Sequence, residues 1–492
     1  MIYTVFRRLS HAIAVVGFFG ILLAVAGCKS HGSTAVSQPV TPDETGKAKV
    51  WLTTGDKAKL LNRESDLPIV KTASANWPVI SVDTSVRFQT MAGFGAALTG
   101  SSAYLLHQKM DAAARANVLQ QLFDTVNGIG ISYLRLTIGA SDFSLADFTY
   151  DDLNSGETDF ALQKFSLGKD LDDVVPVLKE IVQITPKISL LGSPWSPPAW
   201  MKTNGSMKGG SLRTDCYDVY AGYFARYIQD MKAQGITISA VTPQNEPLYA
   251  TANYPCMQML PAEQLAFIKN NLGPKFQSAG IQTRIIIYDH NWDNTNYAIS
   301  ILNDAGAAGY IAGSAFHAYA GDVSAMSTVH FAHPEKDLYF TEISGGSWAN
   351  DFGANLAWYM NNIFIGTALN WSKSALLWNL VLDQNHGPQN NGCSNCRGVI
   401  TLNTSTSQVV NNEEFYAVAH FSKFVRPGAA RISVTFLQSL PGLTAVAFQN
   451  PDGSKALVAC NTGTAMQTFT VKQGSRNFAY TVPVQSVVSI VW

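Results

Sequence analysis

The feature that most constrains the fold is an alternation of short apolar runs with longer amphipathic segments, which occurs eight times between residues 93 and 382. Helical periodicity marks the intervening segments, for example Leu105–Phe123, Tyr217–Ala233, Ala262–Leu272 and Asn355–Ala368. Eight such units predict an α/β fold, a closed parallel (β/α)8 barrel. The expected strands are Gly93–Thr99, Ser132–Gly139, Ile188–Trp195, Ser239–Glu246, Thr283–His290, Ser314–Tyr319, Asp337–Ile343 and Ser374–Leu382.

The flanks of this repeat have a different pattern. Residues 51–90 and 432–492 contain β-like runs with Gly and Pro turns and little helical period, such as Thr444–Phe448 and Val484–Val491. Neither flank has enough strands for a stable domain alone. We therefore expect both flanks to form one β-sandwich beside a barrel of residues 91–431.

The N-terminus is typical of an export signal. Arg7 and Arg8 precede an apolar stretch that is short for a membrane span, so residues 1–27 are interpreted as a signal peptide. Val25-Ala26-Gly27-Cys28 resembles a bacterial lipobox, which predicts lipidation of Cys28 and anchorage in the cell envelope, at the outer membrane or cell surface. Cleavage after Ala24-Val25-Ala26 would instead release a secreted protein. A polar, disordered tether is expected over residues 28–50.

Because an exported protein meets an oxidising environment, the remaining cysteines can form disulfides. Cys393 and Cys396 form a CxxC without the further ligands that a zinc site needs, so we expect a local disulfide that restrains a loop. Pairing of Cys216 with Cys256 stays open, and Cys460 is expected to be a buried thiol. The formal net charge of -1 gives no reason to expect nucleic acid as a partner.

Two predicted strands end in glutamate. Glu246 ends the fourth strand and Glu342 the seventh, and glutamate is depleted both in strands and in buried positions. In a (β/α)8 barrel the active site lies at the C-terminal ends of the strands, so these two carboxyls should meet at one mouth. Glycoside hydrolysis needs such a pair, one carboxyl protonated and one ionised. The alternative is two unrelated glutamates bonded to neighbouring loops.

Other strand ends carry residue types that bind sugars. Indole rings suit the apolar face of a pyranose, while Asp, Asn and Arg suit its hydroxyls. Each of these residues also has an ordinary structural interpretation as core or as a partner of a neighbouring charge. The candidates are Arg135, Asp142, Trp195, Asn245, His317, Tyr319 and Trp378.

Several short motifs together resemble glycoside hydrolase family 30, the glucosylceramidase and endo-β-1,6-glucanase group. They are Gly93-Phe94-Gly95, Ser193-Pro194-Trp195-Ser196-Pro197-Pro198-Ala199-Trp200-Met201-Lys202, Asn245-Glu246-Pro247, Phe340-Thr341-Glu342, Leu377-Trp378-Asn379 and His420-Phe421-Ser422-Lys423-Phe424.

The resemblance implies a retaining double displacement on β-glucosidic bonds, with Glu246 as acid/base and Glu342 as nucleophile. It also implies that Asn245 bonds the sugar 2-hydroxyl, and that Asp142, Trp195 and Trp378 hold the glycone. Arg135 and Tyr319 would keep Glu342 ionised and aimed, with His317 in support, while a less polar setting would keep Glu246 protonated. No metal or organic cofactor is expected, because two carboxyls suffice for this chemistry.

Residues 383–398 depart from the animal lysosomal pattern and look more like bacterial and fungal members of the family, several of which act on β-1,6-glucan. The expected substrate is therefore β-1,6-glucan or a glucosylceramide-like β-glucoside, and recognition of ceramide itself is less expected. Three alternatives remain: a xylan-active enzyme of the same family, a non-catalytic glycan-binding lipoprotein, and a serine esterase. The esterase is disfavoured because the chain has no G-x-S-x-G motif.

Overall fold

The computed structural model describes residues 44–72 and 76–492. The predicted signal peptide, Cys28 and the tether up to residue 43 lie outside the described residues. The tether prediction is wrong for residues 44–50. They belong to strand β1 (Glu44–Thr54), whose Lys49 and Val50 pair with Val491 and Ile490 of the last strand.

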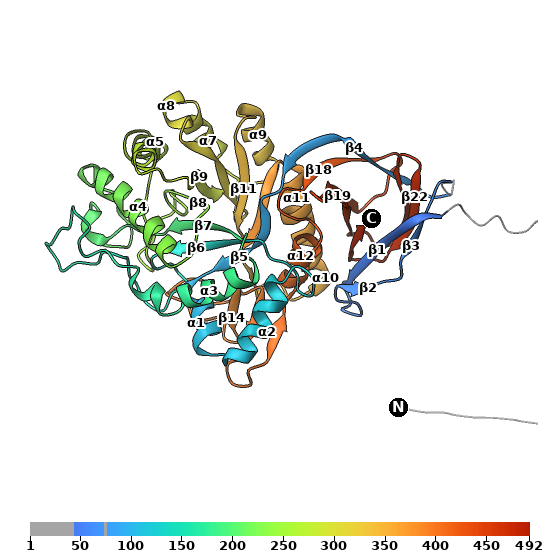
Figure 1. Cartoon of the computed structure of the whole chain (residues 1–492), viewed down its shortest axis with the longest axis horizontal. Helices are drawn as coiled ribbons and strands as arrows, with labels where there is room; N and C mark the ends of the chain where they lie inside the picture. The colour runs from blue at the N-terminus through green and yellow to red at the C-terminus, as the bar shows by residue number, and fades with distance from the viewer. Residues whose placement is uncertain (1–43, 73–75) are drawn as a thin grey trace, which may run out of the picture. The chain divides into compact units, whose positions relative to one another are not determined.

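All eight predicted barrel strands are present and close into one parallel barrel (Figure 1). Their limits differ from the expected ones mainly at the fourth strand, which is only two residues long, so that Glu246 lies in the loop beyond it. The barrel strands are β5 (Gly93–Leu98), β6 (Tyr133–Ile138), β7 (Ser189–Pro194), β8 (Ala240–Val241), β9 (Arg284–Asn291), β10 (Ile311–His317), β11 (Asp337–Glu342) and β13 (Ser372–Leu377).

Helices cover the outside of this barrel (Figure 1). The predicted helix Leu105–Phe123 is two helices, because the side chain of Asp111 accepts a hydrogen bond from the Ala114 amide and starts a new helix after Gln108. The helices are α1 (Gly100–Gln108), α2 (Ala112–Phe123), α3 (Val174–Ile184), α4 (Tyr217–Ala233), α5 (Pro261–Phe267), α6 (Gly273–Ser278), α7 (Thr295–Leu302), α8 (Ala305–Ala308), α9 (Ala325–Ala332), α10 (Phe352–Trp358), α11 (Ile365–Leu369) and α12 (Glu413–Ser422), with π-helical turns at Ile268–Leu272 and Tyr359–Phe364.

The barrel interior is filled in two layers that follow from strand geometry. Alternate residues of a strand point to the same side, so residues two apart on one strand both face inward. The lower layer is the packed core cluster Tyr133, Leu191, Ala240, Ile286, Ala315, Tyr339 and Leu376. Two residues further along five of these strands come the polar side chains Arg135, Ser193, Thr242, His317 and Thr341. The upper layer is therefore a polar floor beneath the C-terminal mouth.

The two flanks combine into one β domain, as predicted. Its ten-stranded sheet folds back on itself because β3 pairs with both β22 and β1. The strands are β1, β2 (Asn62–Arg63), β3 (Leu67–Val70), β4 (Val79–Thr90), β18 (Ala430–Phe436), β19 (Leu443–Gln449), β20 (Lys455–Asn461), β21 (Gln467–Gln473), β22 (Arg476–Val482) and β23 (Ser486–Val491).

The β domain is joined to the barrel through the buried side chain of His420 on α12. One ring nitrogen of His420 lies 2.8 Å from the Ser489 hydroxyl of β23, and the other lies 2.8 Å from the Thr53 hydroxyl of β1. Both ends of the described chain are thus tied to one barrel helix.

Two short sheets border the barrel mouth. One joins β14 (Val381–Asp383), β16 (Ile400–Leu402) and β17 (Val409–Asn411), and the other joins β12 (Gly345–Gly346) to β15 (Cys396–Arg397). Cys393 and Cys396 form the predicted disulfide. Cys216 and Cys256 are unpaired and buried, so the possible bridge between them is absent, and Cys460 is a buried thiol in β20.

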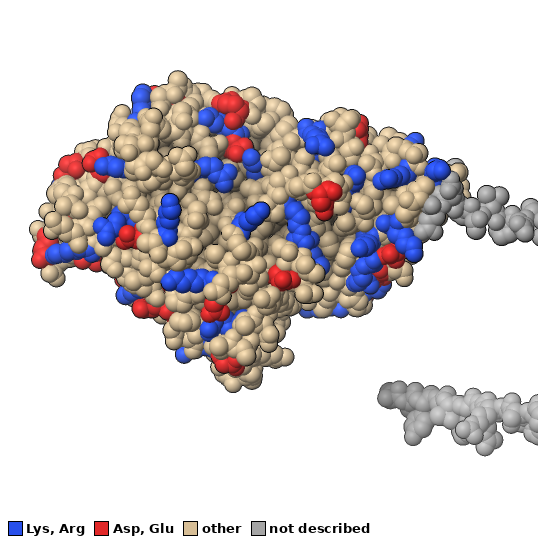
Figure 2. Space-filling model, viewed as in Figure 1, with Lys and Arg blue, Asp and Glu red and all other residues tan. Residues whose placement is uncertain are grey.

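The charged side chains are spread over the surface with both signs mixed and wide uncharged areas between them on the face shown in Figure 2. This distribution agrees with the formal net charge of -1. Among the described helices, none is both long and apolar enough to cross a bilayer.

Candidate active site

Seven of the predicted site residues line one cavity of about 740 Å³ at the C-terminal mouth of the barrel, a volume typical of ligand sites. Arg135 and His317 lie in the polar floor below and are fully buried. The cavity-lining predicted residues are Asp142, Trp195, Asn245, Glu246, Tyr319, Glu342 and Trp378.

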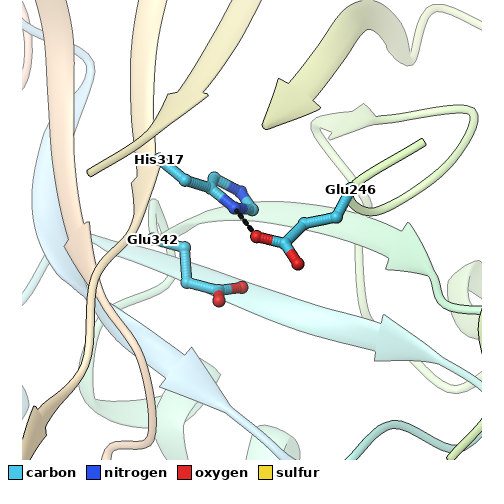
Figure 3. A group of neighbouring side chains, drawn as sticks. All are labelled: Glu246, His317 and Glu342. Atoms are coloured by element: carbon cyan, nitrogen blue, oxygen red, sulfur yellow. Dashed lines mark hydrogen bonds and ion pairs between the residues drawn. The ribbon is translucent and has the colours of Figure 1, made fainter. Parts of the chain in front are cut away.

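The two glutamates approach each other closely across this cavity. A carboxyl oxygen of Glu246, a carboxyl oxygen of Glu342 and a ring nitrogen of His317 all lie within 4.8 Å of one another (Figure 3). Retaining glycosidases hold their carboxyls about 5–5.5 Å apart, whereas inverting enzymes need a wider gap for water. The spacing in this chain therefore matches the retaining geometry.

Glu342 comes at the end of β11 and is held by two donors. The Arg135 guanidinium bonds one of its oxygens, and the Tyr319 hydroxyl donates to the other at 3.0 Å. Burial raises the pKa of Glu342, while the positive charges of His317 and Arg135 oppose that rise. The predicted contacts of Arg135 and Tyr319 with this glutamate are thus both present.

Glu246 lies in the loop after β8 with a left-handed backbone (φ +43°), anchored by its amide on the Asp289 carbonyl at 3.0 Å. Its setting is not the less polar one that we expected, because His317 Nδ1 lies 3.1 Å and His290 Nε2 4.0 Å from its carboxyl. Burial alone would raise the pKa of Glu246, but the hydrogen bond and charge of His317 lower it. The contacts with His317 therefore favour the ionised form of Glu246.

The hydrogen bond between His317 Nδ1 and Glu246 Oε1 can supply the proton that Glu246 needs as an acid. Burial lowers the pKa of His317, but Glu342, Asp289 and Glu246 together raise it to about 9. An imidazolium beside a carboxylate and a neutral imidazole beside a carboxylic acid differ only in the position of one proton between Nδ1 and Oε1. The two side chains thus form one proton-holding unit.

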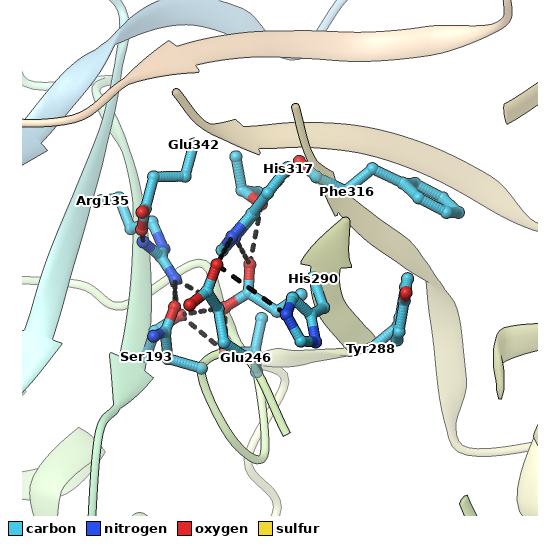
Figure 4. Close-up of polar contacts among 12 residues, drawn as sticks. Arg135, Ser193, Glu246, Tyr288, His290, Phe316, His317 and Glu342 are labelled. Atoms are coloured by element: carbon cyan, nitrogen blue, oxygen red, sulfur yellow. Dashed lines mark hydrogen bonds and ion pairs between the residues drawn. The ribbon is translucent and has the colours of Figure 1, made fainter. Parts of the chain in front are cut away.

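Asp289 on β9 organises the polar floor, and the sequence analysis missed it. One of its oxygens accepts hydrogen bonds from Arg135, Ser193 and Thr242 at 2.7–2.9 Å. The other accepts from the Thr341 hydroxyl at 2.7 Å and lies 3.0 Å from His317 Nε2. Figure 4 shows three of these partners, Arg135, Ser193 and His317, gathered in one group of side chains. Its position near the end of the predicted fifth strand was a signal that could have identified it, since the same rule singled out the other site residues.

The charges in this floor account for the number of protons in the site. Burial would raise the pKa of Asp289, but Arg135 and His317 hold it far below its ordinary range. Two buried cations then face Asp289, Glu246 and Glu342, and the carboxyl of Asp142 faces the same cavity with its pKa raised well above the ordinary value by burial, Glu342 and Glu246. Because a buried net charge is costly, at least one of these carboxyls is expected to be protonated.

The raised pKa of His317 predicts a specific dependence of stability on pH. Since the folded pKa of about 9 exceeds the ordinary value of 6.5, the imidazolium stabilises the fold fully below pH 6.5 and loses this effect as pH rises through 9. We expect the unfolding free energy of the wild type to lose on the order of 3 kcal/mol over this range, and that of His317→Asn to lose less. Urea titrations between pH 6 and 9.5 test this, with His333→Asn as the control. Parallel pH profiles for wild type and His317→Asn would contradict it.

Aromatic side chains form the walls of the cavity. Trp195 and Trp378 stack with ring centroids 5.1 Å apart, and the Arg135 guanidinium lies 5.0 Å and 5.6 Å from the two rings. Tyr249, Tyr254, Trp348 and Trp358 also line the cavity. The Trp348 ring rests on Gly346, where an added Cβ would lie 1.9 Å from the ring, so the indole is supported from below while 56% exposed.

Among the described residues, Glu246, His317 and Glu342 also form the group whose atoms are close enough to hold a metal ion. The contact between His317 Nδ1 and Glu246, however, already occupies the ring nitrogen and one carboxyl oxygen that would face such an ion. These three side chains therefore fit an acid–base group better than a metal site.

A closed (β/α)8 barrel with two opposed carboxyls at this spacing, indole walls and an amide beside the acid defines a glycosidase of the retaining type. The chain belongs to glycosyl hydrolase family 30. The family's TIM-barrel domain model matches residues 91–425, and its β-sandwich domain model matches residues 428–490.

Individual relatives agree with this assignment. The chain is 35% identical to an endo-1,6-beta-D-glucanase of Neurospora crassa over 404 residues, which cover 79% of this chain and 82% of the relative. It is 31% identical to a putative glucosylceramidase 4 of Caenorhabditis elegans, with 86% and 84% covered. A solved structure of the endo-beta1,6-glucanase BT3312 superposes with a TM-score of 0.85 at 38% identity, covering 91% of this chain and 99% of that one.

Proposed function

We propose that this glycosidase hydrolyses β-1,6-linked glucan by double displacement. The observation that supports this most directly is the pair of carboxyls, Glu246 and Glu342, facing each other at the floor of an aromatic-walled cavity. The similarity to endo-1,6-β-glucanases supports the choice of substrate.

In the first step, the Glu342 carboxylate attacks the anomeric carbon as the glycosidic C–O bond breaks, and Glu246 gives its proton to the leaving oxygen. In the second step, Glu246 takes a proton from water, and the resulting hydroxide displaces Glu342 from the sugar. Two inversions give net retention. Arg135 and Tyr319 hold Glu342 in the attacking geometry, and His317 holds the proton that Glu246 transfers.

The remaining predicted residues are assigned to glycone binding. Asn245 already accepts a 2.6 Å hydrogen bond from Arg135 through its oxygen, which leaves its NH2 group to face the sugar 2-hydroxyl. The stacked pair Trp195 and Trp378 offers an apolar wall, and Asp142 offers a carboxyl.

The composition of the walls favours a glucan over a ceramide on the leaving-group side. The aliphatic side chains that line the cavity are Ala318, Ile343 and Ala349, and the other lining residues are mostly aromatic or polar. A sugar uses ring faces and hydrogen bonds, whereas a lipid chain needs extended aliphatic surface. A xylan-active enzyme has less support, because the relatives above are glucanases and glucosylceramidases.

Product analysis on three substrates tests the proposal. We expect the purified chain to release glucose or gluco-oligosaccharides from β-1,6-glucan much faster than it cleaves glucosylceramide or xylan, with the β-anomer as the first product seen by NMR. Glu342→Ala is the control for contaminating activity. Preferred cleavage of either other substrate would overturn the choice of glucan, and a first-formed α-anomer would overturn the mechanism.

We further propose that the protein is exported and held at the bacterial cell envelope by a lipid on Cys28. The support is the lipobox-like Val25-Ala26-Gly27-Cys28. Wild-type protein should incorporate a labelled fatty acid and Cys28→Ala should not. An unlabelled wild type found in the medium would favour cleavage after Ala26 and a secreted enzyme.

A further inference from the structure

A loop in the C-terminal part of the barrel sequence packs directly against Asp142. This segment, Gln389–Cys396, is called the disulfide loop because Cys393 and Cys396 close its C-terminal part. The Asn390 amide donates to the Asp142 carbonyl at 2.7 Å. The Asn390 side-chain amide donates to the Ser141 carbonyl at 3.2 Å and to Asp147 Oδ1 at 2.6 Å.

Gly392 brings the loop backbone into direct contact with the same aspartate. A Cβ at this position would lie 2.7 Å from Asp142 Cβ, 2.9 Å from its carbonyl oxygen and 2.9 Å from Oδ2. These separations are shorter than any ordinary carbon contact, and two of the three atoms belong to the backbone or its first side-chain carbon. Only glycine fits here without displacing Asp142.

The carboxyl of Asp142 depends on this contact because, in the part of the chain that the structure describes, no other residue donates a hydrogen bond to its buried Oδ1. The side chain faces the catalytic cavity, yet its buried Oδ1 has no hydrogen-bond partner among the described residues. Other buried carboxyls of the site, such as Asp289 and Glu342, are aimed by several donors. The direction of the Asp142 carboxyl is therefore set by its backbone and by packing.

The disulfide loop is itself firmly anchored at the opposite side of the mouth. Gly346, just past the end of β11, pairs with Cys396, and the Ser347 amide donates to the Asn395 carbonyl at 2.9 Å. Next in the chain, Arg397 forms ion pairs with Glu413 and Glu414 at the start of α12. The loop thus connects the residues just after β11, the strand that ends in Glu342, to the segment that carries Asp142.

We propose that the disulfide loop positions Asp142 against the hydroxyls of the glycone, with Gly392 and Asn390 as its positioning residues. This inference rests on the proposed function, in which Asp142 contacts the sugar. It assigns a role in glycone binding to a loop that is about 250 residues away in sequence.

Gly392→Ala tests this directly. We expect kcat/KM on the best glucan substrate to fall by about 10- to 100-fold, mainly through KM, because a displacement of about 1 Å is enough to lose oriented contacts. Ser394→Ala, an exposed change in the same loop, should retain wild-type constants. The decisive measurement is the double variant. If the loop acts through Asp142, Gly392→Ala should change KM by less than about twofold in an Asp142→Ala background.

Asn390→Ala provides a second route, since it removes the side-chain bonds to Ser141 and Asp147 without adding an atom. Thermal unfolding of each variant separates loss of the fold from loss of the site. Unchanged KM in folded Gly392→Ala and Asn390→Ala, or effects that multiply with that of Asp142→Ala, would overturn the inference while leaving the glucanase proposal intact. A wild type without activity on any β-glucoside would overturn both.

Discussion

Replacing Glu342 by alanine is expected to lower turnover of an aryl β-glucoside by on the order of 10⁴- to 10⁶-fold, because no covalent intermediate can form without the attacking carboxylate. The fold should survive. Glu246→Ala should also abolish turnover of glucan, but a substrate with a good leaving group should still be able to form the intermediate, because it does not need the acid's proton.

Azide separates the two roles. A small anion can replace either lost carboxylate, but the stereochemistry of the product depends on which step it replaces. With Glu342→Ala, azide should attack the substrate directly and give the α-glucosyl azide. With Glu246→Ala, azide should attack the glycosyl-enzyme and give the β-glucosyl azide. The reverse pattern would exchange the two assignments.

A matched control is available in Glu335, whose side chain is 60% exposed. Glu335→Ala should leave kcat and KM at wild-type values. Near-native activity of Glu342→Ala, confirmed in a preparation free of other glucosidases, would show that the nucleophile is a different residue.

The second large effect is expected at Arg135. This fully buried guanidinium bonds Glu342, Asn245 and Asp289 at once. Arg135→Met would leave Asp289 and Glu342 without their shared counter-charge, and removing one partner of a buried ion pair costs about 3–5 kcal/mol. The loss of positive charge should also raise the pKa of Glu342 further, so the acidic limb of kcat/KM should move to higher pH.

Urea unfolding at pH 7 and a pH–rate profile measure the two effects separately. Arg135→Lys should keep only part of the stability and only part of the effect on the acidic limb of kcat/KM. An ammonium group keeps the positive charge but cannot match the planar guanidinium that reaches three acceptors. Arg226→Met removes an arginine that is 47% exposed and paired with Asp230, so it should cost no more than about 1 kcal/mol. Equal stability losses at Arg135 and Arg226 would contradict the central role of the buried guanidinium.

Much of the architecture could be read from local patterns. The barrel strands were predictable because buried parallel strands appear as apolar runs that alternate with helical period, and Glu342 stood out at the end of such a run. The break between α1 and α2 was missed because a single capping aspartate, Asp111, interrupts an otherwise continuous apolar pattern. The strand nature of residues 44–50 was missed because their polar composition resembles a linker, while their pairing partner lies at the other end of the chain.

The fold class, the pair of glutamates and most of the cavity-lining residues could be predicted from local patterns, because strand periodicity and strand-end position are local properties. How these residues are charged and held depends on tertiary contacts. Asp289 joins side chains from four strands and the hydroxyl of Thr242 just past β8. His317 makes the setting of Glu246 polar, and the disulfide loop reaches across the mouth to Asp142. These contacts depend on barrel closure and loop conformation, which bring distant residues within hydrogen-bond distance, and no local pattern encodes such distances.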